Sequence, residues 1–181
     1  MGEGELTCGS TVTGTTTQFS GMIIETTIPS ASCTASSEHP PGAQFACENA
    51  FDANTGTEWA TQGQGAGSWI QSEFGATYRL TRFEYRHRNS NEDNRQITLS
   101  FSDGSSQTFT LQDNVRGNQA FAVTPVQTTF VRITLDTVYE VINNGGQITF
   151  TGLQGKLSLP TAPQLVKPSA LQCCAAVVGC S

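Results

Sequence analysis

The chain of 181 residues carries little charge, and basic residues are the scarcer kind. Charged residues make up 13% of the sequence, against about a quarter in typical globular domains. Nine Lys and Arg stand against fifteen Asp and Glu, which gives a formal net charge of -6. Nucleic acids and anionic membrane surfaces are bound through a basic footprint that this balance does not supply. The composition therefore argues against both as partners.

Long apolar runs and common catalytic motifs are also missing. No stretch of 18 apolar residues occurs, so we predict no membrane insertion. Neither a Gly-x-Ser-x-Gly sequence nor a nucleotide-binding glycine loop is present, and we predict no enzymatic activity. The first residues lack the basic and apolar segments of a signal peptide. We interpret the chain as a mature product or as part of a longer secreted protein.

The sequence contains six cysteines, an even number, and none shows the spacing of a zinc site. They are Cys8, Cys33, Cys47, Cys173, Cys174 and Cys180. Disulfides in an oxidising, extracellular compartment are the better interpretation. Cys33 and Cys47 flank a short loop with Pro and Gly and form a natural pair. Cys8 can join the distant tail, and the adjacent Cys173 and Cys174 require other partners, which include cysteines of another chain.

Apolar residues alternate with polar ones in several short runs, and no window has helical periodicity. The runs occupy residues 69–74, 82–88, 96–101, 107–111, 129–135 and 147–157. Between two of them, the sequence 102–105 contains Asp-Gly, which favours a hairpin turn. Short strands at this spacing predict an all-β, antiparallel sandwich or barrel.

The alternating runs divide the chain into three parts. Residues 27–157 form the predicted domain. Residues 1–26, with a strand-like run at 18–25, are an N-terminal extension or the edge of a preceding module. Residues 158–181 form a Pro-containing linker and a Cys-rich tail.

Five motifs follow one another in an order that resembles a known family. They are Ala35-Ser-Ser-Glu-His39, the run from Glu48 through Asn-Ala-Phe-Asp to Trp59, residues 67–74, Tyr85-Arg-His-Arg88 and residues 101–105. Over about residues 30–157 the chain resembles the discoidin family, or coagulation factor V/VIII type C domain, whose fold includes galactose-binding carbohydrate-binding modules. The resemblance implies an eight-stranded jelly-roll β-sandwich that binds without catalysis. It also implies that Trp59 and Trp69 are core residues. One departure is Ala53, where the family usually has Gly.

The resemblance implies a structural calcium ion at the Asn-Ala-Phe-Asp loop. Its ligands would be the Asn49 carbonyl, the Asp52 carboxylate, and the hydroxyl and carbonyl of Thr57, all hard oxygens that suit calcium. The family usually adds a Glu from the last strand, and we find no carboxylate at the matching place. The alternative is that Asp52 caps the turn through hydrogen bonds to the backbone.

The resemblance also implies a sugar site in loops at one end of the sandwich. The matching residues are His39, Arg88 and Asn94, whose donors and acceptors can bind vicinal hydroxyls. Arg86 is a rival for Arg88, and Tyr139 is our best candidate for the aromatic residue that such sites add. The alternatives are that Arg88 forms a salt bridge with Glu92 or Asp93, that His39 is only a surface residue before Pro40-Pro41, and that Tyr139 belongs to the core.

These observations predict a secreted, non-catalytic carbohydrate-binding or adhesion module whose partner is a glycan or glycoprotein. The alternative is a structural subunit of an extracellular fibre, coat or matrix, assembled through protein contacts and disulfides with other copies or modules. Lipid recognition, as in the coagulation members, requires apolar side chains at loop tips, and loop 62–67 has none.

Overall fold

The computed structural model describes residues 24–40, 42–88 and 92–154, and every structural statement below concerns these residues. They form strands and two short helical segments, α1 (Gly42–Phe45) and the 3-10 helix η1 (Cys47–Ala50). The strands are β1 (Thr26–Ile28), β2 (Ser32–Ala35), β3 (Trp59–Ala60), β4 (Trp69–Arg86), β5 (Asn94–Phe101), β6 (Ser106–Thr110), β7 (Gln119–Val138) and β8 (Gly145–Gln154). All their pairings are antiparallel, which confirms the predicted all-β sandwich.

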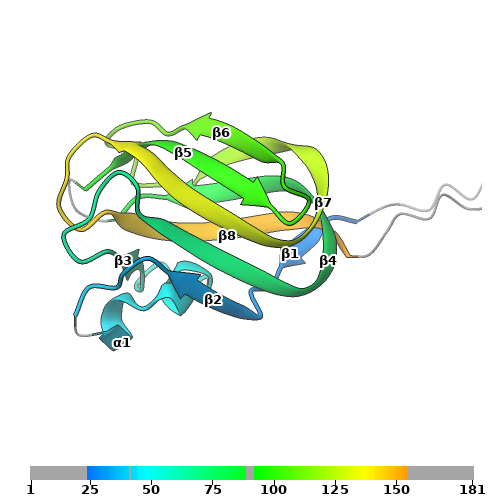
Figure 1. The fold of residues 1–181 in the computed structure, drawn as a ribbon, viewed down its shortest axis with the longest axis horizontal. Coiled ribbons are helices and arrows are strands. Elements are labelled where there is room, and N and C mark those ends of the chain that lie inside the picture. The colour runs from blue at the N-terminus through cyan, green and yellow to red at the C-terminus, as the bar shows by residue number, and fades with distance from the viewer. Residues whose placement is uncertain (1–23, 41, 89–91, 155–181) are drawn as a thin grey trace, which may run out of the picture.

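The strands form two layers because the two longest, β4 and β7, contribute to both (Figure 1). One layer has the order β2–β4–β7–β5–β6 and uses the first part of β4 and the last part of β7. In the other layer, β8 lies between β4 and the short strands β1 and β3, and the first part of β7 completes the sheet. Two stacked antiparallel layers are the architecture of a jelly roll.

The predicted alternation marks the face of each strand that enters the core. On β4, Ile70, Phe74, Leu80, Phe83 and Tyr85 are all buried between the layers. Rings from both layers meet there, since the Phe83 centroid lies 4.8 Å from that of Phe109 on β6. Burial of these large side chains is the main stabilising contribution to the fold.

The two tryptophans differ in burial. Trp59 is fully buried, and its indole N–H donates to the Ser37 carbonyl at 3.0 Å, as expected of a core residue. Trp69 is only half-buried, so the prediction that it is a core residue is wrong. It lies on the face of β4 opposite to Ile70, where the guanidinium carbon of Arg132 is 4.1 Å from a ring centroid of the indole. An arginine, not the core, therefore covers this ring.

Strand β4 joins two runs that the periodicity predicts as separate strands, 69–74 and 82–88. Its register with β7 is interrupted between Glu73 and Tyr78, and Gly75 adopts a φ of 71° there. Glycine reaches this left-handed conformation without steric cost, so the strand bends into the second layer and remains continuous. The alternation predicted which residues face the core, but it could not predict this connection.

The turn at 102–105 joins β5 to β6 as predicted. Gly104 has a φ of 85°, and the Asp103 carboxylate accepts the Ser105 N–H at 2.9 Å. Because the side chain of Asp103 accepts a backbone donor two residues later, it fixes the turn in the way that Asx turns do.

The two ends of the sandwich carry different parts of the chain (Figure 1). At one end, on the left in the figure, the segments before β3 and the β3–β4, β4–β5 and β7–β8 connections come together. We call this end the rim. At the other end Thr26 of β1 pairs with Gly152 of β8, so the first and last described residues lie near each other. The predicted linker and tail, 158–181, and most of the predicted extension, 1–26, lie outside the described residues. No described helix is long and apolar enough to cross a membrane.

Candidate functional site

Arg88 is the centre of a buried ion-pair cluster at the rim. It follows the end of β4 and is 9% exposed. Its Nε donates to Glu58 Oε1 at 2.8 Å, and its Nη1 donates to the Glu92 carboxylate and, at 2.6 Å, to the Asn143 carbonyl. The salt bridge to Glu92 is one of the two that the sequence offered. Since the partners come from three segments, Arg88 fastens the loops of the rim together.

His39 lies beside this cluster, and Phe45 of α1 links the two. The rings of His39 and Phe45 meet edge to face, with centroids 5.2 Å apart. The guanidinium carbon of Arg88 lies 5.1 Å from the centroid of the same phenyl ring. His39 Nδ1 is a buried atom with no hydrogen-bond partner among the described residues. The structure therefore brings His39 and Arg88 to a shared aromatic ring, and the unpartnered Nδ1 of His39 is shielded from solvent beside it.

Asn94, the third predicted ligand residue, has an interior position instead. It is fully buried at the start of β5. Its Nδ2 donates to the Tyr85 hydroxyl at 2.7 Å and to the Gly145 carbonyl at 2.8 Å. Desolvation by burial raises the pKa of Tyr85 far above its usual value, so this hydroxyl remains protonated and donates to Gly145. The amide of Asn94 holds β4, β5 and β8 together below the rim and does not face a surface ligand.

Arg86 and Tyr139 also point elsewhere. Arg86 Nε donates to the Arg116 carbonyl at 3.1 Å, and its Nη1 contacts the Thr55 carbonyl at 3.4 Å. The Tyr139 hydroxyl donates to the Leu111 carbonyl at 3.2 Å, while its ring packs against Arg95. Tyr139 is 40% exposed, so it does not belong to the core. Of the five predicted ligand residues, only His39 and Arg88 meet around Phe45.

A second ion pair supports the Arg88 cluster from the side. Arg116 Nη1 lies 2.6 Å from Asp93 Oδ1 and donates to the Arg88 carbonyl at 3.3 Å. Asp93 also borders a surface pocket of about 290 Å³. The pocket is lined by Asp93, Asp113, Asn114, Tyr139 and Glu140. Carboxylates therefore dominate this part of the rim.

The β7–β8 connection also exposes aliphatic side chains at the rim. Val141 is 65% and Ile142 49% exposed. A Cβ added to Gly65 would lie 2.9 Å from Val141 Cγ1, so this connection packs against loop 62–67. Loop 62–67 itself has no apolar tip, whereas this neighbouring connection has two exposed aliphatic side chains.

The loop predicted to bind calcium is held by hydrogen bonds within the chain. Asp52 Oδ1 accepts the Asn54 N–H at 2.8 Å, and Oδ2 accepts the Thr57 hydroxyl at 2.6 Å. This is the turn-capping arrangement that the sequence left open. The carbonyls of Asn54 and Thr57 both accept from the side-chain amide of Gln147 on β8. The side chain of Asn49 donates to the Gln44 carbonyl at 2.9 Å. Calcium at this loop stays a prediction.

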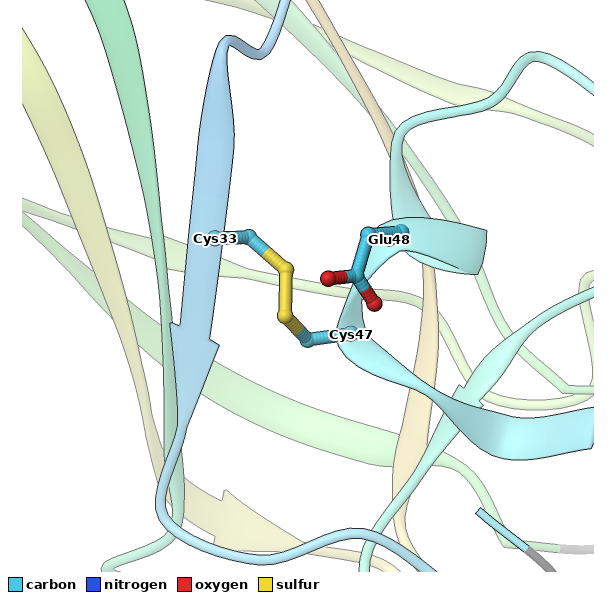
Figure 2. A group of neighbouring side chains, drawn as sticks. All are labelled: Cys33, Cys47 and Glu48. Atoms are coloured by element: carbon cyan, nitrogen blue, oxygen red, sulfur yellow. A yellow bond between two sulfur atoms is a disulfide. The ribbon is translucent and has the colours of Figure 1, made fainter. Parts of the chain in front are cut away.

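The predicted disulfide between Cys33 and Cys47 is present, and it ties β2 to η1 (Figure 2). The Cα atoms are 6.1 Å apart, within the ordinary range for a disulfide. Glu48 lies next to the two sulfurs, but both sulfurs are bonded to each other and cannot act as thiolate ligands of a metal. The closed loop contains both His39 and Phe45. The other four cysteines lie outside the described residues, so their predicted partners stay untested.

Comparison with known proteins identifies the family. The F5/8 type C domain matches residues 32–149, which is most of the described sandwich. The chain belongs to the F5/8 type C domain family. The discoidin-like resemblance read from the motifs is thereby confirmed. A comparison with curated protein sequences found no match.

Solved structures with this F5/8 type C fold include several sugar complexes. The family 32 carbohydrate-binding module of C. perfringens NanJ, in complex with galactose, has a TM-score of 0.59 at 17% identity, over 71% of this chain and 99% of that one. Chitosan-binding module 2 of a Paenibacillus sp. IK-5 chitosanase/glucanase, in complex with chitotriose, has a TM-score of 0.58 at 16% identity. The match covers 68% of this chain and 97% of that one. The family 32 module of AlyQ, in complex with 4,5-unsaturated mannuronic acid, has a TM-score of 0.56 at 18% identity. The match covers 69% of this chain and 97% of that one. At these identities the likeness establishes the fold.

Sequence reasoning missed Phe45, Glu58, Asn143 and Gln147. Phe45 lies in a four-residue helix that shows no periodicity, although its place inside the Cys33–Cys47 loop with His39 was a usable signal. Glu58 and Asn143 meet Arg88 across 30 and 55 residues, a relation that no local pattern contains. Gln147 lies on the last strand, where the family pattern predicts a carboxylate and not an amide.

Proposed function

We propose that this F5/8 type C domain is a secreted, non-catalytic glycan-binding module, and that its rim binds the sugar. The observation that carries the proposal is the convergence of His39 and Arg88 on the ring of Phe45. Sugars combine hydroxyl groups with apolar C–H faces, so their sites pair planar hydrogen-bonding groups with an aromatic ring. Phe45, in place of Tyr139, takes the aromatic role in this proposal.

Two further observations support the proposal. The structural neighbours include modules in complex with galactose and with chitotriose, so this fold accommodates sugar ligands in other proteins. The chain contains the Cys33–Cys47 disulfide. Disulfides form and persist in oxidising compartments, which agrees with a secreted module. The rim also lies at the end of the sandwich opposite the described termini (Figure 1).

The test is a binding screen against immobilised neutral, amino-sugar and acidic oligosaccharides, followed by titration of the best ligand. Phe45→Ala should weaken binding by about fivefold or more, because an aromatic contact contributes about 1 kcal/mol. Phe130→Ala is the matched control, since it removes another half-buried phenylalanine, from β7 at the end remote from the rim. Equal affinity of the Phe45→Ala variant and the wild type would reject the site, and failure to bind any sugar would reject the function.

A further inference from the structure

The positive charge of Arg88 is more than neutralised by its own partners. Its Nε and Nη1 contact the carboxylates of Glu58 and Glu92, and the three side chains are 10%, 20% and 7% exposed. One guanidinium against two carboxylates leaves this triad with a net charge of -1. The neighbouring ion pair of Arg116 with Asp93 adds no net charge. A ligand that contacts Arg88 therefore meets a negative environment.

The rest of the described rim does not reverse this balance. Asp113 and Glu140 border the adjacent pocket, and their two charges match those of Arg86, which contacts the carbonyls of Arg116 and Thr55, and of Arg95, which lies over the ring of Tyr139. An acidic sugar bound at Arg88 would place its carboxylate or sulfate close to Glu58 and Glu92. Like charges at such distances repel, most strongly where the groups are partly removed from water. No comparable penalty applies to an uncharged hydroxyl or to an ammonium group.

We propose that the rim selects uncharged and amino sugars and rejects uronic acids and sulfated sugars. This inference rests on the proposed glycan-binding function. The structural neighbours include complexes with a neutral, an amino and an acidic sugar, so the fold alone does not decide the class. In this chain the carboxylates of Glu58 and Glu92 set the sugar class, because they repel acidic ligands and do not repel neutral or amino sugars.

The test compares the affinities of the full chain for a galactose-terminated oligosaccharide, for chitotriose and for a mannuronate trisaccharide. We expect the mannuronate to bind at least about tenfold more weakly than the better of the other two. Glu58→Gln keeps a hydrogen-bonding group beside Arg88 and removes one charge. The Glu58→Gln variant should reduce the ratio between the affinity for the better of the other two ligands and the affinity for the mannuronate by about fivefold.

Glu84→Gln is the control for this comparison, because Glu84 pairs with Arg82 on the outer face of β4 and its replacement changes the net charge equally. Tight binding of the mannuronate by the wild type would overturn the inference and leave the glycan-binding function standing. The same holds if Glu58→Gln and Glu84→Gln give the same ratio of affinities. Absence of binding to all three ligands would instead overturn the function and the inference together.

A separate observation concerns the Asp52–Thr57 loop. The Thr57 carbonyl, one of the predicted calcium ligands, accepts a hydrogen bond from the Gln147 amide, and so does the neighbouring Asn54 carbonyl. Both carboxylate oxygens of Asp52 also accept donors of the loop itself. Only the nitrogen of the Gln147 amide can face two carbonyl oxygens favourably. The donor set therefore does not fit a cation without rearrangement.

We infer that the side-chain amide of Gln147 closes this loop in place of a cation, so that the loop needs no calcium. The melting temperature of the wild type should be the same in millimolar calcium and in chelator, because a ligand stabilises a protein only if it binds the folded state. Gln147→Glu turns a carboxylate toward the two carbonyls. This variant should melt at a lower temperature in chelator and recover in calcium, whose ligands are carboxylate and carbonyl oxygens.

Gln107→Glu is the control, because this substitution adds the same charge on β6, remote from the loop. A wild type that calcium stabilises would overturn the inference. A Gln147→Glu variant whose melting temperature does not respond to calcium would overturn the assignment of the two carbonyls.

Discussion

His87 is a buried histidine below the rim. Its side chain is 2% exposed; Nε2 lies 2.9 Å from the Gln112 carbonyl, and Nδ1 faces the Asn94 N–H at 3.4 Å. These neighbours fit a neutral ring with its proton on Nε2. Desolvation by burial lowers the pKa of His87, although the Gln112 carbonyl and the Asp93 carboxylate oppose the shift.

The lowered pKa of His87 predicts that acid destabilises the protein. The unfolded chain takes up the proton near pH 6.5, whereas the folded chain takes it up only at lower pH. The free energy of unfolding should therefore fall as the pH drops below about 6.5 and stop falling once the folded-state pKa is passed. Urea unfolding between pH 7.5 and pH 5 measures this dependence.

A His87→Asn variant should lose that part of the pH dependence, and His39→Asn, which changes the other histidine, should keep it. An unchanged slope for His87→Asn would show that other groups cause the acid sensitivity.

At the scale of elements, the Cys33–Cys47 disulfide links stability to the site. It joins two cysteines that are 14 positions apart in the sequence, and the loop between them contains His39 and α1 with Phe45. By the chain-entropy model, a bridge over a loop of this size stabilises the fold by about 3 kcal/mol. The bridge also fixes the loop that presents the aromatic ring, and a preorganised loop loses less entropy on binding.

Removal of this bridge should therefore affect both properties. The double variant Cys33→Ala/Cys47→Ala should lose about 3 kcal/mol in the free energy of unfolding and should bind glycan more weakly than the wild type. Substitution is preferable to reduction, because a reducing agent would act on every disulfide of the chain. Urea unfolding and sugar titration at a temperature where the variant is folded test the two effects separately. A variant with unchanged affinity would mean that the disulfide does not preorganise the rim.

The elements themselves follow from local patterns to a large extent. The period-two alternation places Ile70, Phe74 and Phe83 in the core, and the Asp-Gly pair fixes the β5–β6 turn. The passage of β4 between layers depends on a conformation of Gly75 that alternation does not encode. Trp69 belongs to the family motif, but the exposure of its ring depends on Arg132 from a strand distant in sequence.

At the scale of the whole molecule, the motif order predicts the family and the sandwich, whereas the composition of the rim depends on contacts between distant segments. His39 and Arg88 carry motif positions and could be predicted. The ring between them and the two carboxylates around Arg88 come from three different segments, which only the folded chain brings together. Asn94 matched the family position as well, yet its burial below the rim follows from its bonds to Tyr85 and Gly145.

The central claim is that the rim of the sandwich binds a glycan, and NMR mapping of backbone amides tests it most directly. Addition of the best-binding neutral or amino sugar should shift the resonances of His39, Phe45 and residues 139–144. Amides at the opposite end, in the turn 102–105 and around Thr26 and Gly152, should remain unchanged. Shifts confined to that opposite end, or no shift at saturating sugar, would contradict the account.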